Sequence, residues 1–285
     1  MNYQIQPLKP GLYFVATPIG TARDITLRAL DILASADIVA AEDTRTLRRL
    51  MEIHGIPLGQ RPLIAYHDHS GAGARAKLFG YLAEGKSVAY ASEAGTPLIA
   101  DPGYHLSKGA SEDGHLVTSA PGPSAIITAL SLAGLPTDAF FFAGFLPNAR
   151  NARRNGLEAV SAVPGTLVFY ESPKRLVEML KDAAKVLGET RQAVVCRELT
   201  KKFEEVQRGS LTELATLFSE RTVKGEIVVL IDRAGAEDVG DADIEQALQK
   251  ALETMTVRDA SEVIAQAYGV NKRKIYSLAL SMKNT

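Results

Sequence analysis

The sequence predicts an α/β protein with two α/β domains and a helical tail. Over the first 120 residues, short β-rich runs alternate with amphipathic helical stretches, which favours a mainly parallel sheet covered on both faces. In the second half, two predicted strands follow one another without an intervening helix, which favours a mixed sheet. A small, acidic segment at 234–243 then reads as a linker. The expected domains span 11–120, 121–233 and 242–285.

The composition excludes several classes of function. The 285 residues include 33 acidic and 32 basic side chains, a formal charge of -1, so no polybasic nucleic-acid coat is present and any RNA contact must come from local patches. The single cysteine excludes a disulfide framework and a cysteine zinc cage. No apolar run approaches the roughly 20 residues that span a bilayer. We therefore expect a soluble, cytoplasmic protein without membrane contacts.

The first domain is expected to hold five strands, with a helix at Asp24–Ala36 between the first two. In such sheets, ligands bind beyond the carboxyl ends of the strands, so the loops that follow the strands are the candidate site. The expected strands are Leu12–Ala16, Asp37–Ala41, Pro62–Tyr66, Ser87–Ala91 and His115–Ser119.

Two of these loops have the composition of a binding site. Gly20 ends the loop after the first strand and lets the backbone approach a ligand closely, although an ordinary turn would also use it. The twelve residues 92–103 follow the fourth strand and combine two X-Pro bonds and two glycines with the polar groups of Glu93, Thr96 and Asp101. This composition favours a ligand-binding loop over a purely structural one.

Acidic and histidine side chains follow two further strands. After the second strand, Glu42 and Asp43 precede a predicted helix at Thr46–His54, so one acid can cap that helix while the other faces the site. After the third, His67 and His69 resemble half a metal site, but no third ligand is evident. We therefore predict polar contacts rather than a metal.

The second domain follows a proline-rich hinge at 121–123 and a helix at Ser124–Ala133. Residues 148–155 carry three arginines and no acid, and we interpret them as a loop that contacts RNA, the alternative being a solvated, partly helical surface. Cys196 lies in an apolar run and is expected to be a buried small hydrophobe. The strands are expected at Ala139–Gly144, Thr166–Tyr170, Gln192–Arg197, Glu204–Gly209 and Glu226–Ile231.

The tail has the pattern of a helix-turn-helix. Two amphipathic stretches, Val257–Tyr268 and Lys272–Met282, flank Gly269, and basic residues cluster where the second begins. This favours a contact with a nucleic-acid backbone. A capping or dimerising helical hairpin remains the alternative.

Taken in order, the motifs resemble those of the small-subunit ribosomal RNA methyltransferases of the tetrapyrrole methylase superfamily. The resemblance covers residues 11–285. Two positions depart from the family pattern: Thr21 replaces an asparagine, and Glu93 replaces an aspartate. Both keep hydrogen-bonding ability. The motifs are Thr17–Gly20, Asp24–Ile25, Arg28–Leu30, Glu42–Arg45, His67–His69, Glu93–Pro97, Asp101–Gly103, Pro121–Ser124, Gly144–Pro147, Phe169–Ser172, Arg197–Thr200 and Lys224–Glu226.

The resemblance implies a homodimer that binds S-adenosyl-L-methionine between its two α/β domains. It further implies methylation of a cytidine ribose 2′-oxygen in 16S rRNA of the small ribosomal subunit, near the decoding region. The cofactor contacts that it implies are Pro18, Ile19, Gly20, Glu93, Ala94, Gly95, Thr96, Pro97, Ile99, Ser124, Ala125, Tyr170, Leu199 and Gly225.

A ribose hydroxyl is a poor nucleophile, so a general base should help. The candidates, all at strand ends, are Glu42, Asp43, His67 and Asp101. The expected phosphate contacts are Arg45, Arg150, Arg153, Arg154, Lys201, Lys272 and Arg273. Two other functions stay open: a methyltransferase acting on a small corrin-like molecule, which would not need the tail, and a non-enzymatic regulator that binds DNA.

Overall fold

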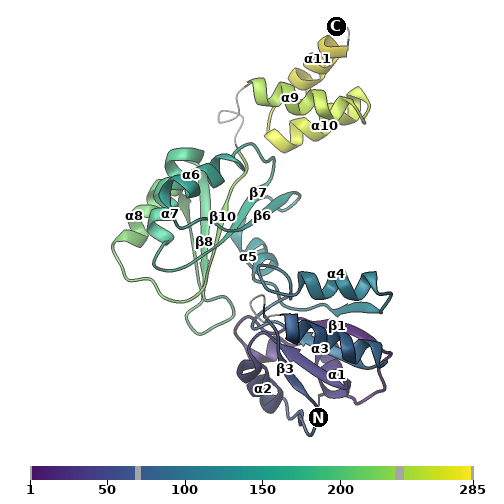
Figure 1. Cartoon of the computed structure of the whole chain (residues 1–285). Coiled ribbons are helices and arrows are strands. Elements are labelled where there is room, and N and C mark those ends of the chain that lie inside the picture. The colour runs from purple at the N-terminus through teal and green to yellow at the C-terminus, as the bar shows by residue number, and fades with distance from the viewer. Residues whose placement is uncertain (1, 68–71, 235–240, 284–285) are drawn as a thin grey trace. The chain divides into compact units, whose positions relative to one another are not determined.

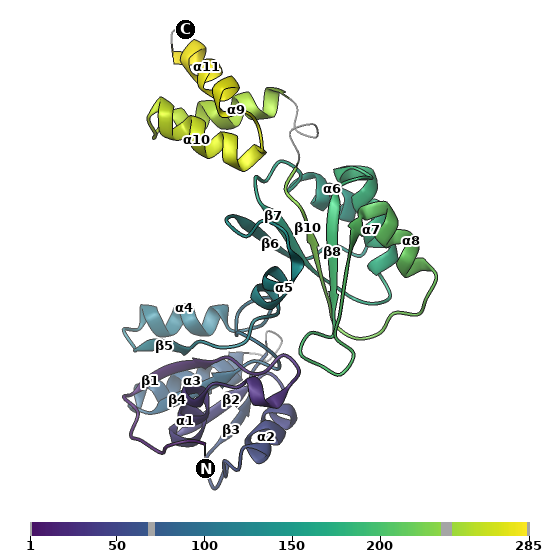
Figure 2. The same cartoon turned by 180° about the vertical axis from the view of Figure 1, so that it is seen from behind.

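The computed structural model describes residues 2–67, 72–234 and 241–283. The chain forms two compact units, Met1–Thr128 and Ala129–Thr285, with the helical tail in the second. The division falls inside α5 (Ala125–Ala133), slightly beyond the boundary expected at residue 120. Figures 1 and 2 show the elements of each unit from opposite sides.

The first unit is built on a five-stranded sheet in the order β3-β2-β4-β1-β5. Every neighbouring pair is parallel, so the carboxyl ends of all five strands meet at one edge. Four buried strand residues in a row, as in β2, fit a sheet that is covered on both faces. The strands are β1 (Gly11–Val15), β2 (Ile38–Ala41), β3 (Leu63–Ala65), β4 (Ser87–Ala91) and β5 (Val117–Ala120).

Helices cover both faces of this sheet. One set of alternating strand side chains packs with α1 (Leu27–Ser35) and α2 (Thr44–Ile53), and the other set with α3 (Ala72–Ala83) and α4 (Tyr104–Glu112). The single helix expected at Asp24–Ala36 is wrong in one respect. A short 3-10 turn, η1 (Ala22–Asp24), comes first, and α1 then begins because the Thr26 hydroxyl accepts a hydrogen bond from the backbone N–H of Ala29.

The second unit holds a mixed sheet in the order β6-β7-β10-β8-β9, which confirms the expectation from the sequence. Only β6 and β7 are parallel, and β8 and β9 form the hairpin of two successive strands. The strands are β6 (Phe140–Phe145), β7 (Thr166–Glu171), β8 (Gln192–Arg197), β9 (Glu205–Ser210) and β10 (Ile227–Ile231).

Three helices pack on one face of this sheet. They are α6 (Arg150–Glu158), α7 (Leu176–Leu187) and α8 (Leu211–Ser219), and their apolar side chains form one cluster with the strands. Residues 148–155 were expected to form a loop, but they are largely helical, because α6 begins at Arg150. Leu157, fully buried, anchors that helix to the core. The single cysteine, Cys196, is buried in β8, and burial raises the pKa of its thiol to about 11.

The tail consists of α9 (Asp241–Leu252), α10 (Val257–Tyr268) and α11 (Lys272–Lys283) around a small apolar core. Gly269, at a φ of 64°, ends α10 in the left-handed conformation that favours glycine. Most of the expected linker, residues 235–240, lies outside the described residues. None of the described helices combines the length and the apolar character that crossing a membrane requires.

Candidate active site

Three loops interlock at the carboxyl edge of the first sheet. The backbones of Thr17, after β1, and Gly95, after β4, exchange two hydrogen bonds of 2.9 and 3.0 Å. The Thr96 hydroxyl donates to the carbonyl of Pro123, after β5, at 3.0 Å. Since β4, β1 and β5 are neighbours in the sheet, the loops predicted to bind the cofactor form one continuous structure.

Glycine is required where these loops touch. At Gly95, with a φ of 82°, an added Cβ would lie 3.3 Å from Cγ2 of Ile19. At Gly122, it would lie 3.0 Å from the Cβ of Ala16. A side chain at either position would require its neighbour to move by a few tenths of an ångström, so these glycines allow the loops to approach closely.

The loop at residues 92–103 also holds strained backbone. Leu98 and Ala100 adopt φ values of 72° and 59°, which side-chain-bearing residues rarely do. The Tyr90 hydroxyl secures the end of the loop by donating to the Pro102 carbonyl at 3.2 Å. Between the two strained residues, Ile99 is 40% exposed. Such strain is concentrated at functional sites, and no local sequence signal beyond the nearby glycines and prolines indicates it.

Among the four candidate bases, Asp101 has the most unusual environment. Burial, and then the charges of Glu42 and Glu93, raise its pKa to about 7. Asp43 instead caps α2: its carboxylate accepts from the backbone N–H of Arg45 at 2.8 Å, which lowers its pKa. The capping role predicted for one acid of this pair therefore falls to Asp43.

The histidine motif is only partly described. His67 is exposed at the end of β3, while Asp68 and His69 lie outside the described residues. In the part of the chain that the structure describes, no three His, Cys, Asp or Glu side chains are grouped to hold a metal ion. Compared with Asp43, whose pKa is lowered, Asp101 better suits proton transfer near neutral pH, because a general base works best when its pKa lies near the working pH.

In the second unit, the three predicted cofactor residues come to one edge of the sheet. Ile227, at the start of β10, pairs with the last residues of β7 and β8. This register brings together Tyr170 at the end of β7, Leu199 just after β8 and Gly225 just before β10. A Cβ on Gly225, whose φ is 94°, would lie 2.4 Å from the Glu198 carboxyl carbon, so this glycine is also required.

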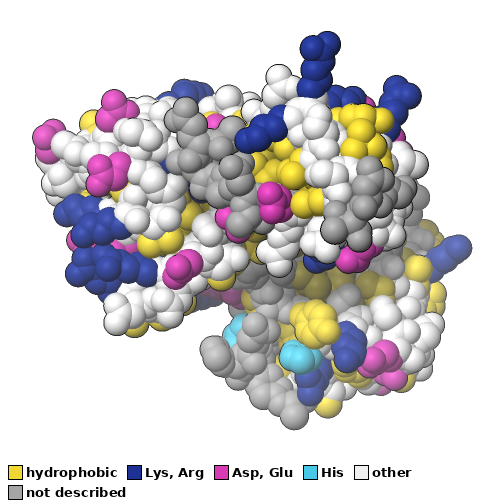
Figure 3. Space-filling model, turned by 90° about the horizontal axis from the view of Figure 1, so that it is seen from above, with side chains coloured by type: hydrophobic (Ala, Val, Ile, Leu, Met, Phe, Trp, Pro, Cys, Tyr) yellow, Lys and Arg dark blue, Asp and Glu magenta, His cyan; other side chains and the backbone are white. Residues whose placement is uncertain are grey.

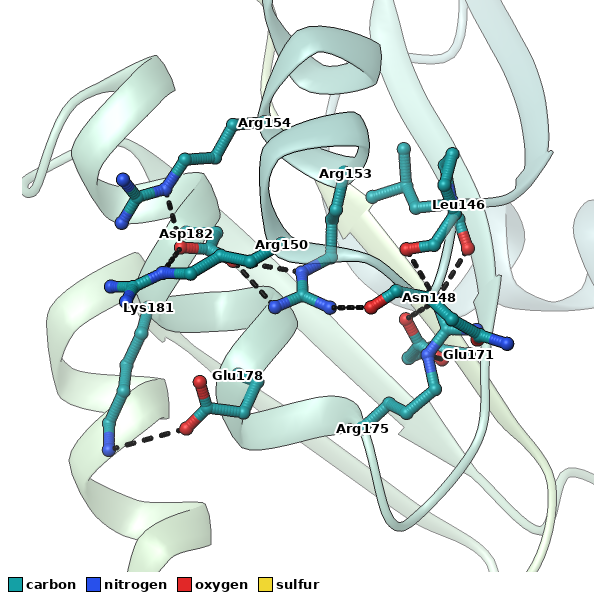
Figure 4. A network of polar contacts seen from close by, with 11 residues as sticks. Leu146, Asn148, Arg150, Arg153, Arg154, Glu171, Arg175, Glu178, Lys181 and Asp182 are labelled. Carbon is teal, nitrogen blue, oxygen red and sulfur yellow. Dashed lines mark hydrogen bonds and ion pairs between the residues drawn. The ribbon is translucent and has the colours of Figure 1, made fainter.

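The arginines of α6 converge on one carboxylate, Asp182 of α7 (Figure 4). Arg153 is 6% exposed; its Nε donates to Asp182 at 2.9 Å and its Nη1 to the Asn148 carbonyl at 3.0 Å. A direct phosphate contact by Arg153 is therefore contradicted, because its guanidinium is buried. Arg154 and Arg150 bind the same carboxylate at 2.8 and 3.4 Å, but their side chains stay 32% and 59% exposed.

The other basic residues predicted to contact RNA differ in how they are held. Arg45 pairs with Asp43 at 3.3 Å, yet its side chain is 92% exposed. Lys201 donates to Glu198 at 2.9 Å and to Glu226 at 2.6 Å, so it braces the loop after β8. In the tail, Lys272 pairs with Glu262.

Arg273, beside Lys272, is exposed at the start of α11. On the face drawn in Figure 3, Lys and Arg side chains form separate small groups. This distribution agrees with the near-zero net charge of the chain.

Comparison with known proteins identifies the family. Residues 11–215 match the family described as Tetrapyrrole (Corrin/Porphyrin) Methylases. The chain belongs to this family. Its tail, residues 238–283, matches the RsmI C-terminal HTH domain, which confirms the helix-turn-helix pattern.

Relatives within the family match nearly the whole chain. A protein of Mesorhizobium japonicum named Ribosomal RNA small subunit methyltransferase I is 48% identical over 98% of this chain and 95% of its own. The protein of the same name from Escherichia coli O157:H7 is 43% identical, over 95% of each chain.

Solved structures support the fold. Cobalt precorrin-4 methyltransferase has a TM-score of 0.60 at 15% identity, over 78% of this chain and 94% of its own. A uroporphyrin-III C-methyltransferase from Thermus thermophilus, complexed with S-adenosyl homocysteine, has a TM-score of 0.53 at 18% identity, over 79% and 98%.

Proposed function

We propose that this protein transfers a methyl group from S-adenosyl-L-methionine to the 2′-oxygen of a cytidine ribose in 16S rRNA, near the decoding region. The main support for an rRNA substrate is the similarity to small-subunit rRNA methyltransferases over nearly the whole chain, including the tail. The cytidine and its 2′-oxygen rest on the motif resemblance, and so do the homodimer and the cytoplasmic location that complete the proposal.

The interlocked loops of the first unit fit the cofactor. Gly95 and Gly122 leave no side chain where the backbones meet, and Ile99, held between two strained residues, offers an exposed aliphatic surface for a purine. Backbone groups of the loops after β1 and β4 would bind the polar ends of the cofactor. Tyr170, Leu199 and Gly225 of the second unit remain predicted contacts.

The chemistry needs little from the protein beyond positioning and proton transfer. When bound, S-adenosylmethionine supplies a methyl group made electrophilic by its sulfonium. The interlocked loops would hold the acceptor oxygen in line and exclude water. Asp101 would accept the proton of the ribose hydroxyl on its carboxylate, because a pKa of about 7 leaves it a competent base at neutral pH.

RNA contacts are proposed for the exposed basic side chains. Arg150 and Arg154 on α6 keep part of their side chains exposed, while Arg45 and Arg273 are exposed at the starts of two other helices. Replacing Arg150 and Arg154 with alanine should weaken binding to small subunits and reduce the slope of log affinity against log salt by about 0.7 to 0.9 per lost contact. An unchanged slope would remove α6 from the interface.

Two measurements test the proposal. Calorimetry with the purified protein should detect binding of S-adenosylmethionine and of its demethylated product; no heat with either would contradict cofactor use. Incubation with methyl-labelled cofactor should then label rRNA in unmodified small subunits and leave a corrin precursor unlabelled. The reverse pattern would favour the small-molecule methyltransferase.

A further inference from the structure

The hairpin loop between β8 and β9 presents an exposed aromatic ring. Phe203 is 63% exposed, although it lies in a loop that a water-soluble protein could build from polar residues alone. The ammonium of Lys202 sits 5.6 Å from the centre of its ring. Figure 2 shows this loop projecting past the end of β8.

The loop is held firmly despite its exposed tip. Glu198 and Thr200 have positive φ values of 51° and 63°, and the backbone N–H of Thr200 donates to the Glu204 carboxylate at 2.6 Å. Lys201 donates to Glu198, and the backbone N–H of Glu226 donates to the same carboxylate at 3.0 Å. The acidic groups of this loop are thus engaged in bracing it.

The position of the loop relates it to the predicted site. It leaves β8 at the sheet edge that carries Leu199 and Gly225, both predicted cofactor contacts. Proteins hold unpaired RNA bases by stacking aromatic side chains on them and by placing cations near the phosphate backbone. The Phe203 ring and the Lys202 ammonium provide this combination beside the predicted site.

We propose that Phe203 stacks on an unpaired base of the RNA substrate and that Lys202 attracts an adjacent phosphate. This inference rests on the proposed rRNA methyltransferase function, and it assigns to this loop the binding of a nucleotide next to the acceptor. Phe203 acts in substrate binding, while the methyl-transfer step itself needs only the groups described above.

The test is a substitution series at this position, assayed with methyl-labelled cofactor and unmodified small subunits. Phe203→Ala should raise KM for the subunits about tenfold, within the range measured for one stacked base, and leave kcat and cofactor affinity within a factor of two. Phe203→Tyr and Phe203→Trp should keep KM near that of the unmodified protein, whereas Phe203→Leu should lose most of the affinity because it has no flat face.

Phe140→Ala is the matched control. Phe140 is 44% exposed and begins β6, at the opposite edge of the same sheet, so its loss should leave KM unchanged. Thermal unfolding of the Phe203 variants should stay close to that of the unmodified protein, since this ring is largely solvent-exposed; Phe140 is partly buried, so its variant is compared at a temperature where it is fully folded.

Three results would overturn the inference. The first is a KM for the subunits that does not change across the series. The second is a Phe203→Leu variant with the KM of the unmodified protein, which indicates packing against a protein surface. The third is a tenfold loss of cofactor affinity, which indicates a cofactor contact. If the unmodified protein labels subunits and the series is flat, the inference alone fails. If the unmodified protein labels no subunits, the proposed function fails and the inference with it.

Discussion

Asp101 of the first unit stands in surroundings opposite to those of Asp182 and Glu198 of the second. Burial, and then the charges of Glu42 and Glu93, raise the pKa of Asp101 to about 7. In the second unit, Asp182 and Glu198 pair with arginine or lysine, and their pKa values are lowered. An acid surrounded by acids is poised for proton transfer near neutral pH, whereas an acid paired with bases stays ionised and holds the framework together.

The pairing in the second unit is strong enough to overcome burial. Burial raises the pKa of Asp182, but hydrogen bonds from Arg154 and Arg153 outweigh it. For Glu198, the hydrogen bond from Lys201 dominates. The sign of the neighbouring charges separates Asp101 from these two acids, although pairing does not lower the pKa of every acid: at Glu171, burial outweighs Arg175 and raises the pKa.

The largest expected effect is on stability, at Asp182. Asp182→Ala should lower the free energy of unfolding by about 4 kcal/mol, because Arg153 would be left buried without its carboxylate. Urea denaturation of the purified protein measures this. Lys181→Ala is the control, since its ion pair is exposed, and should cost less than about 1 kcal/mol. Equal losses in the two variants would remove the structural role assigned to Asp182.

Next comes catalysis at Asp101. Asp101→Asn should slow the single-turnover methyl transfer by about 10²-fold or more, while cofactor binding is kept. In the unmodified protein, the rate should rise with pH through about 7 and level off above it, because the base must lose its proton; the variant should lose this rise.

The amide variants of Glu42 and Asp43, and His67→Gln, complete that comparison. Asp43→Asn should keep the cap of α2, because the amide oxygen can accept the same backbone hydrogen bonds, and should cause a smaller loss of rate. If all four variants retain single-turnover rates within a factor of two, the idea of a general base is wrong.

Gly225 tests how closely the loops of the second edge are packed. Gly225→Ala should cost about 2 kcal/mol, because the new Cβ meets Glu198 and the φ of 94° is strained. Gly134→Ala is the matched control: its φ of 74° is also positive, but nothing lies within 4 Å, so strain alone should cost about 1 kcal/mol. A control as costly as the test variant would refute the close contact.

The smallest effect is a gain in stability at Asp101. An ordinary aspartate has a pKa of 3.8, so the folded protein holds this proton up to about pH 7 while the unfolded chain releases it. Stability is therefore lost as pH rises between these values. At pH 8, the free energy of unfolding of Asp101→Asn should exceed that of the unmodified protein by on the order of 1 kcal/mol once the screening of this half-buried group by solvent is included, and the gain should shrink toward pH 4. A variant less stable at pH 8 would contradict the raised pKa.

Local pattern was enough to predict the strands and the loops that follow them. Ser87–Ala91 and Gln192–Arg197 match β4 and β8, because buried strands read as unbroken apolar runs bounded by turns. The mixed sheet followed from two successive strands with no helix between them. The meeting of the loops after β1, β4 and β5 could also be predicted, because the carboxyl ends of parallel strands lie at the same edge of a sheet.

What the sequence could not reveal depends on contacts between distant residues. Asp182 lies 28 and 32 positions from Arg154 and Arg150, so the arginine run read as an unpaired, RNA-binding loop. The raised pKa of Asp101 needs the nearness of Glu42 and Glu93, which only the fold supplies. The positive φ of Leu98 is likewise invisible, because leucine ordinarily avoids that conformation.

The most direct test of the central claim is a map of ribose methylation in 16S rRNA from cells that lack this protein. We predict that one cytidine near the decoding region loses its 2′-O-methyl group, and that the gene restores the group while the Asp101→Asn form, expressed at the same level, does not. An unchanged methylation map, or full restoration by the Asp101→Asn form, would contradict the account.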